Sequence, residues 1–248
     1  MSQREASMPF SGGALKWIAI FTMLADHIGA CLLEVFVLNY YGSSPLAGQV
    51  DNLYFWASLD AVLRRIGRTA FPIFCFLLVE GALHTRNSRK YLLRLLAFAV
   101  VSEIPFDLAL HNMPFFWGTQ NVFFTLFLGL LVILVFQRYP ADTWKGMLVL
   151  VVLASAAELC GTDYGAVGVA VIVVMYLLRD RFLAAACLSL VLLVLLSRLE
   201  LYCIPAFLAI ALYNGKRGRQ PKYFFYVFYP AHLLLLWAIG NYVLPVWM

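Results

Sequence analysis

The sequence predicts an all-α fold: a polytopic integral membrane helical bundle of about nine transmembrane helices, with the N-terminus cytoplasmic. Of its 248 residues, 63% are hydrophobic and only 12% are charged. Apolar runs of about 20 residues, the length that crosses a bilayer as a helix, recur almost to the C-terminus. Lys and Arg gather in alternate connecting segments, a pattern that sets membrane orientation. We therefore expect one membrane-embedded domain over residues 1–248, with residues 1–14 as a cytoplasmic N-terminal segment.

The length of the apolar runs gives the order of the expected spans. They lie at about 15–38, 61–83, 91–110, 119–137, 146–160, 164–178, 182–197, 199–213 and 224–246. The fifth to eighth spans are short, so a hairpin that does not cross fully is an alternative there. Residues 50–66 overlap the start of the second expected span, and as an alternative they form a separate interfacial or re-entrant helix.

The charged connections support this orientation. With the N-terminus inside, four cytoplasmic segments hold most of the basic residues: His84–Arg94, Arg138–Lys145, Arg179–Arg181 and Asn214–Lys222. The outer connections contain no Lys or Arg: Tyr40–Asn52, His111–Gly118 and Gly161–Asp163. Topology therefore explains the net charge of +5 better than nucleic-acid binding does. The first residues lack an apolar core and a small-residue cleavage site, so no removable signal peptide is expected.

Several familiar motifs are absent. The sequence contains no GxGxxG, GxxxxGK[ST], HExxH or GxSxG, which argues against a nucleotide hydrolase, a zinc protease and a serine hydrolase with a nucleophile elbow. No internal repeat is evident, which disfavours a transporter. The five cysteines stand singly in apolar runs, so we expect them to pack in the core and expect no bound metal.

Asp26 and His27 form the first candidate site, about halfway along the first expected span. A neutral imidazole accepts a proton at physiological pH, so His27 is the predicted general base. Neighbouring residues point about 100° apart on a helix, so Asp26 is expected to pair with an arginine rather than to orient His27. The alternative is that both residues are polar contacts between helices.

Arg64, Arg65 and Arg68 form the second candidate site, in the outer half of the second expected span, where basic residues are disfavoured. Their spacing places Arg65 and Arg68, or Arg64 and Arg68, on one side of a helix. Guanidinium groups bind phosphate oxygens through bidentate hydrogen bonds, which suits a nucleotide-like or pyrophosphate-bearing ligand. The alternative is ion pairing with acidic residues of the bundle, namely Glu80, Glu103 or Asp107.

Glu103 and Asp107 lie four residues apart in the third expected span, on either side of Pro105, which should kink the helix. We expect them to balance the arginines. A carboxylate dyad for acid–base chemistry is the alternative.

Four further polar residues stand near expected helix ends or a proline: His84, Arg86, Asn121 and His232. Solvated-loop and N-cap roles explain the first three about as well as ligand contact does. His232 follows a proline in the last expected span, and a site role and a packing role are equally open.

Five segments, in this order along the chain, resemble the TraX family: LKWIAIFTMLADHIGA, RRIGRTAFPIFCFLLVEGALHTRN, YLLRLLAFAVVSEIPFD, NVFFTL and FYPAHLLLL. The resemblance covers nearly the whole chain. It implies an inner-membrane protein related to the multi-span membrane acyltransferases. The named member of the TraX family acetylates the N-terminal amine of pilin, and the resemblance implies acetyl-CoA as donor. It further implies that His27 deprotonates the attacking amine or hydroxyl and that Arg65 and Arg68 hold CoA. Lys16 stands where the related enzymes usually carry an arginine.

The sequence thus predicts an acetyl-CoA-dependent acyltransferase of a bacterial inner membrane, an N-acetyltransferase by preference, with a pilin-like acceptor. Acetylation of a glycan hydroxyl or amine is the alternative within this class. A proton-coupled transporter or channel, and a non-catalytic assembly factor for a pilus, are the competing classes. One conflict stands: CoA is cytoplasmic, whereas the expected spans place Arg65 and Arg68 towards the outside.

Overall fold

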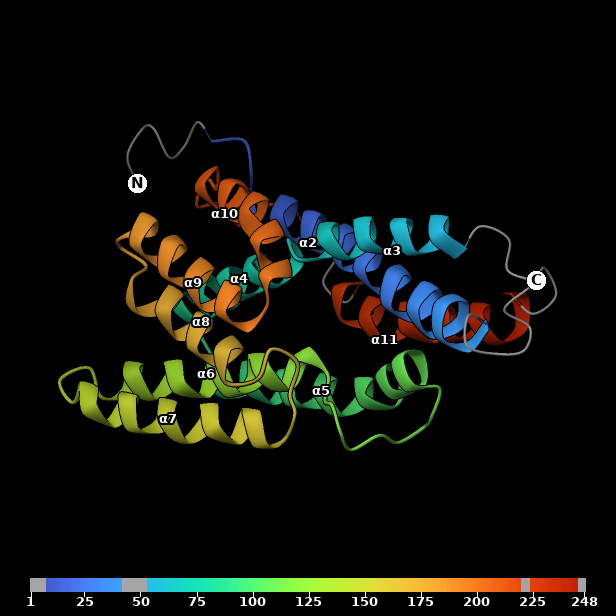
Figure 1. Cartoon of the computed structure of the whole chain (residues 1–248). Helices are drawn as coiled ribbons and strands as arrows, with labels where there is room; N and C mark the ends of the chain where they lie inside the picture. The colour runs from blue at the N-terminus through green and yellow to red at the C-terminus, as the bar shows by residue number, and fades with distance from the viewer. Residues whose placement is uncertain (1–7, 42–52, 220–223, 245–248) are drawn as a thin grey trace.

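The computed structural model describes residues 8–41, 53–219 and 224–244, and these residues form an all-α fold (Figure 1). The elements, in order, are α2 (Gly12–His27), η1 (Ile28–Tyr41), α3 (Leu53–Gly67), α4 (Ala70–His84), α5 (Ser88–His111), α6 (Val122–Arg138), α7 (Thr143–Leu159), α8 (Gly165–Leu177), α9 (Phe182–Leu196), η3 (Arg198–Cys203), α10 (Ile204–Ala211), α11 (Phe224–Ala238) and η4 (Ile239–Val243).

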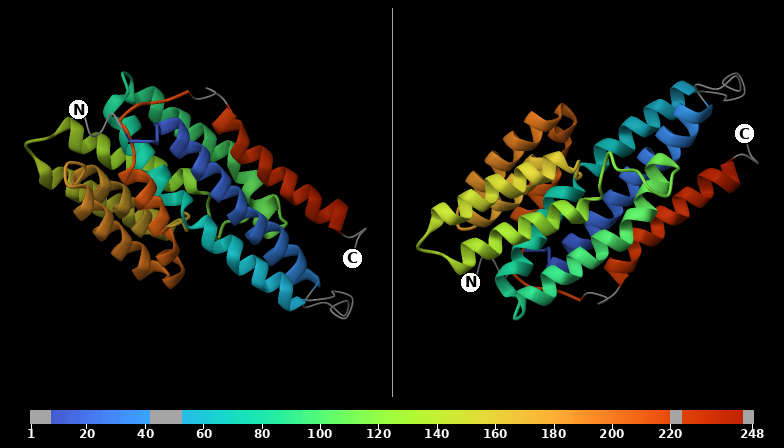
Figure 2. Two further views of the ribbon diagram at one scale, coloured as in Figure 1. Left: turned by 90° about the horizontal axis from the view of Figure 1, so that it is seen from above. Right: turned by 90° about the horizontal axis from the view of Figure 1, so that it is seen from below.

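Three helical stretches of the described chain are long and apolar enough to cross a membrane: Gly12–Leu38, Leu53–His84 and Phe224–Val243. Three shorter apolar helices accompany them: Val122–Arg138, Gly165–Leu177 and Phe182–Leu196. The predicted class, an all-α membrane bundle, is confirmed at this level. Figure 2 shows the helices packed side by side along one main direction.

The expected span at residues 199–213 is wrong. Ser197 is extended and caps η3, and α10 then begins with Pro205 in its first turn. The resulting α10 has 8 residues, which is roughly 12 Å at 1.5 Å per residue and too short to cross a bilayer.

The second expected span is also wrong at its start. The helical stretch from Leu53 to His84 is broken at Arg68 and Thr69, which separate α3 from α4. Pro72 explains the break, because it has no N–H to donate to the Arg68 carbonyl and its ring crowds that carbonyl. The alternative of a separate helix over residues 50–66 is confirmed in that α3 is a helix of its own, which packs along α2 and η1. Its interfacial or re-entrant placement stays a prediction. Arg68 consequently lies at the middle of the stretch and not in its outer half.

The first helix changes its winding at the candidate base. Ser11 caps the start of α2, because its hydroxyl accepts a hydrogen bond from the Ala14 N–H at 3.3 Å. α2 runs to His27 and continues as η1, which has the wider π-helical winding. Such winding is uncommon and often accompanies functional sites.

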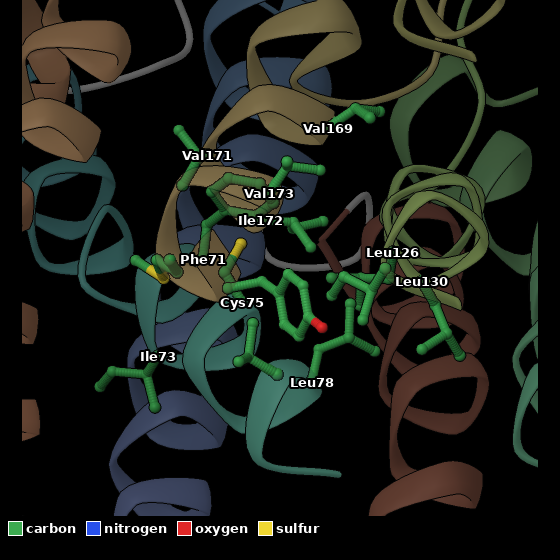
Figure 3. Close-up of a cluster of buried hydrophobic side chains, with 14 of the residues drawn as sticks. Phe71, Ile73, Cys75, Leu78, Leu126, Leu130, Val169, Val171, Ile172 and Val173 are labelled. Carbon is green, nitrogen blue, oxygen red and sulfur yellow. The ribbon is translucent and has the colours of Figure 1, made fainter. Parts of the chain in front are cut away.

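Two apolar clusters hold the bundle together. The larger one joins α4, α6 and α8 (Figure 3), with fully buried side chains that include Ile73, Leu130 and Ile172. The smaller one joins α2, α5 and α11 through Met23, Phe106, Tyr229 and others. Between helices in lipid, close van der Waals packing of this kind provides much of the stability. The smaller cluster seats α11 beside α2, which positions the candidate site.

The cysteine prediction is confirmed for three residues and wrong for two. Cys31, Cys75 and Cys203 are buried, whereas Cys160 and Cys187 are exposed, and all five are free thiols.

Candidate functional site

Two histidines from opposite ends of the chain meet at the centre of the site. His27 Nδ1 lies 2.7 Å from Nε2 of His232, and the two rings stack with centroids 4.9 Å apart. His232 Nδ1 in turn lies 2.7 Å from the carbonyl oxygen of Phe228. His232 therefore lies beside the candidate base, and the residue is 5% exposed.

This chain of hydrogen bonds determines the tautomers. A carbonyl only accepts, so His232 Nδ1 carries the hydrogen and its Nε2 holds a lone pair when the ring is neutral. His27 Nδ1 must then be the donor to His232. The remaining nitrogen of His27, Nε2, has a lone pair and can accept a proton from a substrate.

Asp26 pairs with two arginines, as expected. Its carboxylate lies 2.6 Å from Arg64 Nη1 and also binds the Arg68 guanidinium. Arg64 Nε binds Glu34 at 3.0 Å, and Arg68 Nη1 binds Glu200 at 3.0 Å. Two arginines and three carboxylates thus form one network, in which each guanidinium is balanced at close range.

Arg68 is the centre of this network. Its Nη1 also lies 3.4 Å from the Tyr164 hydroxyl, and Nε donates to the Arg64 carbonyl at 3.1 Å. Tyr164 is itself fixed by stacking on Phe71, with ring centroids 3.7 Å apart. Arg68 therefore connects the break between α3 and α4 to the α7–α8 loop and to η3.

Gly67 allows α3 to approach α2. A Cβ atom at this position would overlap the Asp26 side chain. The absence of a side chain lets the Asp26 carboxylate lie between Arg64 and Arg68.

We predict that Gly67→Ala destabilises the protein by about 1–3 kcal/mol, the usual cost of overpacking a buried site. The Asp26 carboxylate would have to move away from its arginines to make room. Thermal unfolding in detergent measures the change, with Val62→Ala, on the exposed side of the same helix, as control. Equal stability of both variants and wild type would contradict the tight approach.

Arg65 stands apart from the other two arginines. It forms no ion pair with any described residue, and its guanidinium lies over the Tyr202 ring, 5.0 Å from the centroid. The pair that shares one partner is therefore Arg64 and Arg68, through Asp26, while Arg65 keeps an exposed, uncompensated charge.

Glu103 and Asp107 do not balance the arginines, and this expectation is wrong. Glu103 accepts hydrogen bonds from the side chain and backbone of Asn121, and Asp107 accepts one from the Phe116 N–H at 2.9 Å. Asn121 also caps α6, its side chain accepting from the Phe123 N–H at 3.0 Å. These residues lie on the side of α5 that faces α6, so they hold the α5–α6 loop in place.

Four other candidates lie away from the histidine pair. Glu80 accepts a hydrogen bond from the Tyr213 hydroxyl at 3.1 Å. Burial, together with the Glu80 carboxylate, raises the pKa of Tyr213 to about 12, so this hydroxyl stays protonated. His84 and Arg86 are exposed at the α4–α5 connection, and Lys16 lies over the Phe225 ring at 5.3 Å.

Glu34, Glu200 and Tyr164 take part in the network but were not among the residues predicted from the sequence. Glu34 follows Asp26 by eight residues in the first helix, which was a usable signal. Glu200, a single acid in an apolar stretch, was another, because a charge inside a bundle is expected to have a partner. Tyr164 gave no signal, since its contact with Arg68 depends on a loop conformation.

Comparison with known proteins identifies the family. The model for TraX protein matches residues 11–240 of the chain. The probable fimbrial assembly protein FimC, serogroup H1, of Dichelobacter nodosus is 31% identical over 256 residues, with 93% of this chain and 96% of that protein covered. No solved structure matches the chain. The chain belongs to the TraX family.

Proposed function

We propose that the protein is an acyltransferase of a bacterial inner membrane that moves an acetyl group from acetyl-CoA to an amine, by preference the N-terminus of a pilin-like protein. The observation that carries the proposal is the part-buried histidine pair, which leaves the Nε2 lone pair of His27 available. Membership of the TraX family and similarity to a protein described as a fimbrial assembly protein support the acceptor.

His27 acts as the general base. A neutral amine is needed to attack the thioester carbonyl, and His27 Nε2 takes the proton that the amine must lose. The positive charge formed on His27 can be shared with His232 through their 2.7 Å hydrogen bond. The Phe228 carbonyl, 2.7 Å from His232 Nδ1, stabilises that charge.

The donor is held by cationic side chains. Arg65 is the contact best suited to the CoA phosphates, because its charge has no close carboxylate among the described residues. Arg68 and Arg64 organise the site through Asp26, which also stabilises the position of the first helix next to His27.

The position of Lys16 near the N-terminus is consistent with a donor that enters from the cytoplasm. It precedes His27 by eleven residues in the same helix, which is roughly 16 Å at 1.5 Å per residue. An extended phosphopantetheine arm covers such a distance. In this arrangement the N-terminus is cytoplasmic, and the donor enters past Lys16 and reaches Arg65 and His27 towards the middle of the bundle.

We predict that co-expression of the wild-type protein with a pilin-like subunit adds the mass of one acetyl group to the N-terminus of that subunit. Mass spectrometry of the N-terminal peptide measures the modification. With His27→Ala the peptide should be unmodified. Pilus assembly that depends on the protein but is unaffected by His27→Ala, with an unmodified N-terminus in both cases, would instead favour a non-catalytic assembly factor.

A further inference from the structure

A cavity of about 440 Å³ lies between η1, the end of α5 and the α7–α8 loop. We propose that this cavity is the acceptor site, that it opens on the outer face, and that Glu34 and Asp163 bind the acceptor there as an alkylammonium ion. The inference rests on the proposed function and adds to it the place, the side and the chemical class of the acceptor. Its wall also contains Ala30, His111 and Tyr164.

Hydrogen bonds between two loops make a fixed wall of the cavity. The Gln120 N–H donates to the Gly161 carbonyl at 2.9 Å, and the Asp163 N–H donates back to the Gln120 carbonyl at 2.9 Å. The Thr125 hydroxyl donates to the Asp163 carbonyl. Asp163 is thereby held by its backbone on both sides, while its side chain remains exposed to the cavity.

The backbone of the next residue, Tyr164, is held in this loop conformation by its side-chain contacts. Tyr164 has a φ of 63°, in the left-handed region that non-glycine residues seldom adopt. Stacking on Phe71 and the contact with Arg68 hold it there. Backbone strain of this kind persists where the surrounding structure requires it, and it often marks a functional site.

The charges of the wall select a cation. Its residues include two carboxylates and neither Lys nor Arg. The Glu34 carboxylate binds Arg64 but its side chain is still 41% exposed. The Asp163 side chain forms no hydrogen bond or ion pair with the described residues. An ammonium group placed between these carboxylates gains charge-assisted hydrogen bonds that a neutral sugar hydroxyl cannot match.

The cavity is adjacent to the proposed base. Ala30 lies one helical turn after His27 on the same helix. Phe106, another wall residue, belongs to the same apolar cluster as Tyr229, whose ring contacts His27 with centroids 5.8 Å apart. An amine bound in the cavity therefore has a short path to the catalytic nitrogen.

The transfer step balances with the groups named. As the N–C bond to the acetyl carbon forms, the ammonium nitrogen loses two protons. His27 carries one of them to the departing CoA sulfur as the C–S bond breaks, and the other is released to solvent. No metal or redox partner is required.

The bordering loops indicate the outer face. The segments 112–120 and 160–164 contain no Lys or Arg, whereas the connections at 84–94 and 138–145 are basic. Basic connections are retained in the cytoplasm, so the cavity opens on the opposite side. Donor and acceptor would then approach His27 from different faces.

The first test uses a matched pair of acceptors in nanodiscs: alaninamide, which is an ammonium ion, and lactamide, its neutral hydroxyl counterpart. Glu34→Gln and Asp163→Asn should each raise the KM for alaninamide about tenfold or more, the loss expected for a charge-assisted hydrogen bond. The kcat of Asp163→Asn should stay within about twofold of wild type, in keeping with a loss of ground-state binding only, because Asp163 is outside the ion-pair network. Asp180→Asn, an exposed carboxylate outside the cavity, should behave as wild type.

Several outcomes separate this inference from the proposed function. Acetyl transfer with an unchanged KM in both carboxylate variants, or equal use of lactamide, would overturn the acceptor site while leaving an acyltransferase. A wild-type protein that consumes no acetyl-CoA would contradict the proposed function. Saturation-transfer NMR of alaninamide without donor then still tests the cavity, because alaninamide binding should weaken in the variant that combines Glu34→Gln with Asp163→Asn. Unchanged binding in that variant would overturn the acceptor site.

Cys160 tests the side on which the cavity opens. It is an exposed free thiol in the loop that borders the cavity. In a Cys187→Ser background, a membrane-impermeant maleimide added to spheroplasts should label Cys160, and Cys160→Ser should abolish the label. Labelling only after permeabilisation would overturn the outer-face assignment.

Discussion

Replacing His27 with alanine should lower the rate of acetyl transfer by about 10²–10⁴-fold, the usual contribution of a positioned general base. The affinity for acetyl-CoA should stay the same, because the proposed donor contacts are cationic side chains and the His27 ring contacts His232 instead. Single-turnover transfer and equilibrium binding, measured on the same nanodisc preparation, separate the two effects. A variant that retains wild-type turnover would exclude His27 as the base.

His232 provides the matched control for this prediction. His232→Ala should lower the rate, because it removes the acceptor that holds His27 in the tautomer with a free Nε2. His232→Gln offers a side-chain carbonyl to His27 Nδ1 and should recover part of the rate. Nitrogen-15 chemical shifts of His27 should move towards mixed tautomers in His232→Ala only. Identical spectra and rates in all three proteins would contradict this positioning role.

Replacing Arg68 with glutamine should destabilise the fold by about 3–5 kcal/mol, the usual cost of leaving a buried charge without its partner. Glu200 is 2% exposed, and its carboxylate would lose the Arg68 guanidinium. Asp26 would lose one of its two arginines. Thermal unfolding in detergent or nanodiscs measures the loss.

Two variants make this prediction specific. Glu200→Gln added to Arg68→Gln should recover part of the stability, because it removes the unpaired charge, and a double-mutant cycle gives the coupling. Arg65→Gln should leave stability near that of wild type, because Arg65 is exposed and forms no ion pair with a described residue. It should instead weaken acetyl-CoA binding by about tenfold or more. Equal stability of the Arg68 and Arg65 variants would contradict the assigned division of roles.

The sequence predicted the membrane class and most helices because apolar run length and charge distribution depend on local composition. The break at Arg68 and Thr69 was less visible. It depends on Pro72, three residues into α4, whose missing N–H matters only once α3 and α4 are considered as one helix. Because the expected span at 61–83 ran through the break, the arginines were placed in its outer half, and the separate helix over residues 50–66 stood only as an alternative. The structure places Arg68 at the middle of the Leu53–His84 stretch. A donor that enters from the cytoplasm therefore has a shorter distance to reach the arginines than the expected spans indicated.

The pairing of Asp26 with an arginine was predictable, because the angle between adjacent helix positions turns it away from His27. The choice of Glu103 and Asp107 as further partners failed for a reason of packing. Both carboxylates point towards the α5–α6 loop, where they hold Asn121 and the Phe116 N–H. Which face of α5 meets the arginines cannot be decided from spacing alone.

Contacts between distant segments were outside the reach of sequence patterns. His232 follows His27 by 205 positions, and only the packing of α11 beside α2 brings the two rings together. The cavity beside Glu34 likewise depends on the conformation of the α7–α8 loop, in which Tyr164 adopts a left-handed backbone. Local rules predict that such a loop exists but not which side chain it presents.

The proposed acetyl transfer is tested most directly by the binding and turnover of labelled acetyl-CoA by the purified wild-type protein in nanodiscs, with alaninamide as acceptor. We expect saturable binding between micromolar and millimolar acetyl-CoA. We also expect transfer of the label to the amine, and this transfer should be lost in His27→Ala. Absence of donor binding over that range would contradict the proposed transfer, and the buried charges would then have to be tested as a transport pathway by flux measurements in liposomes.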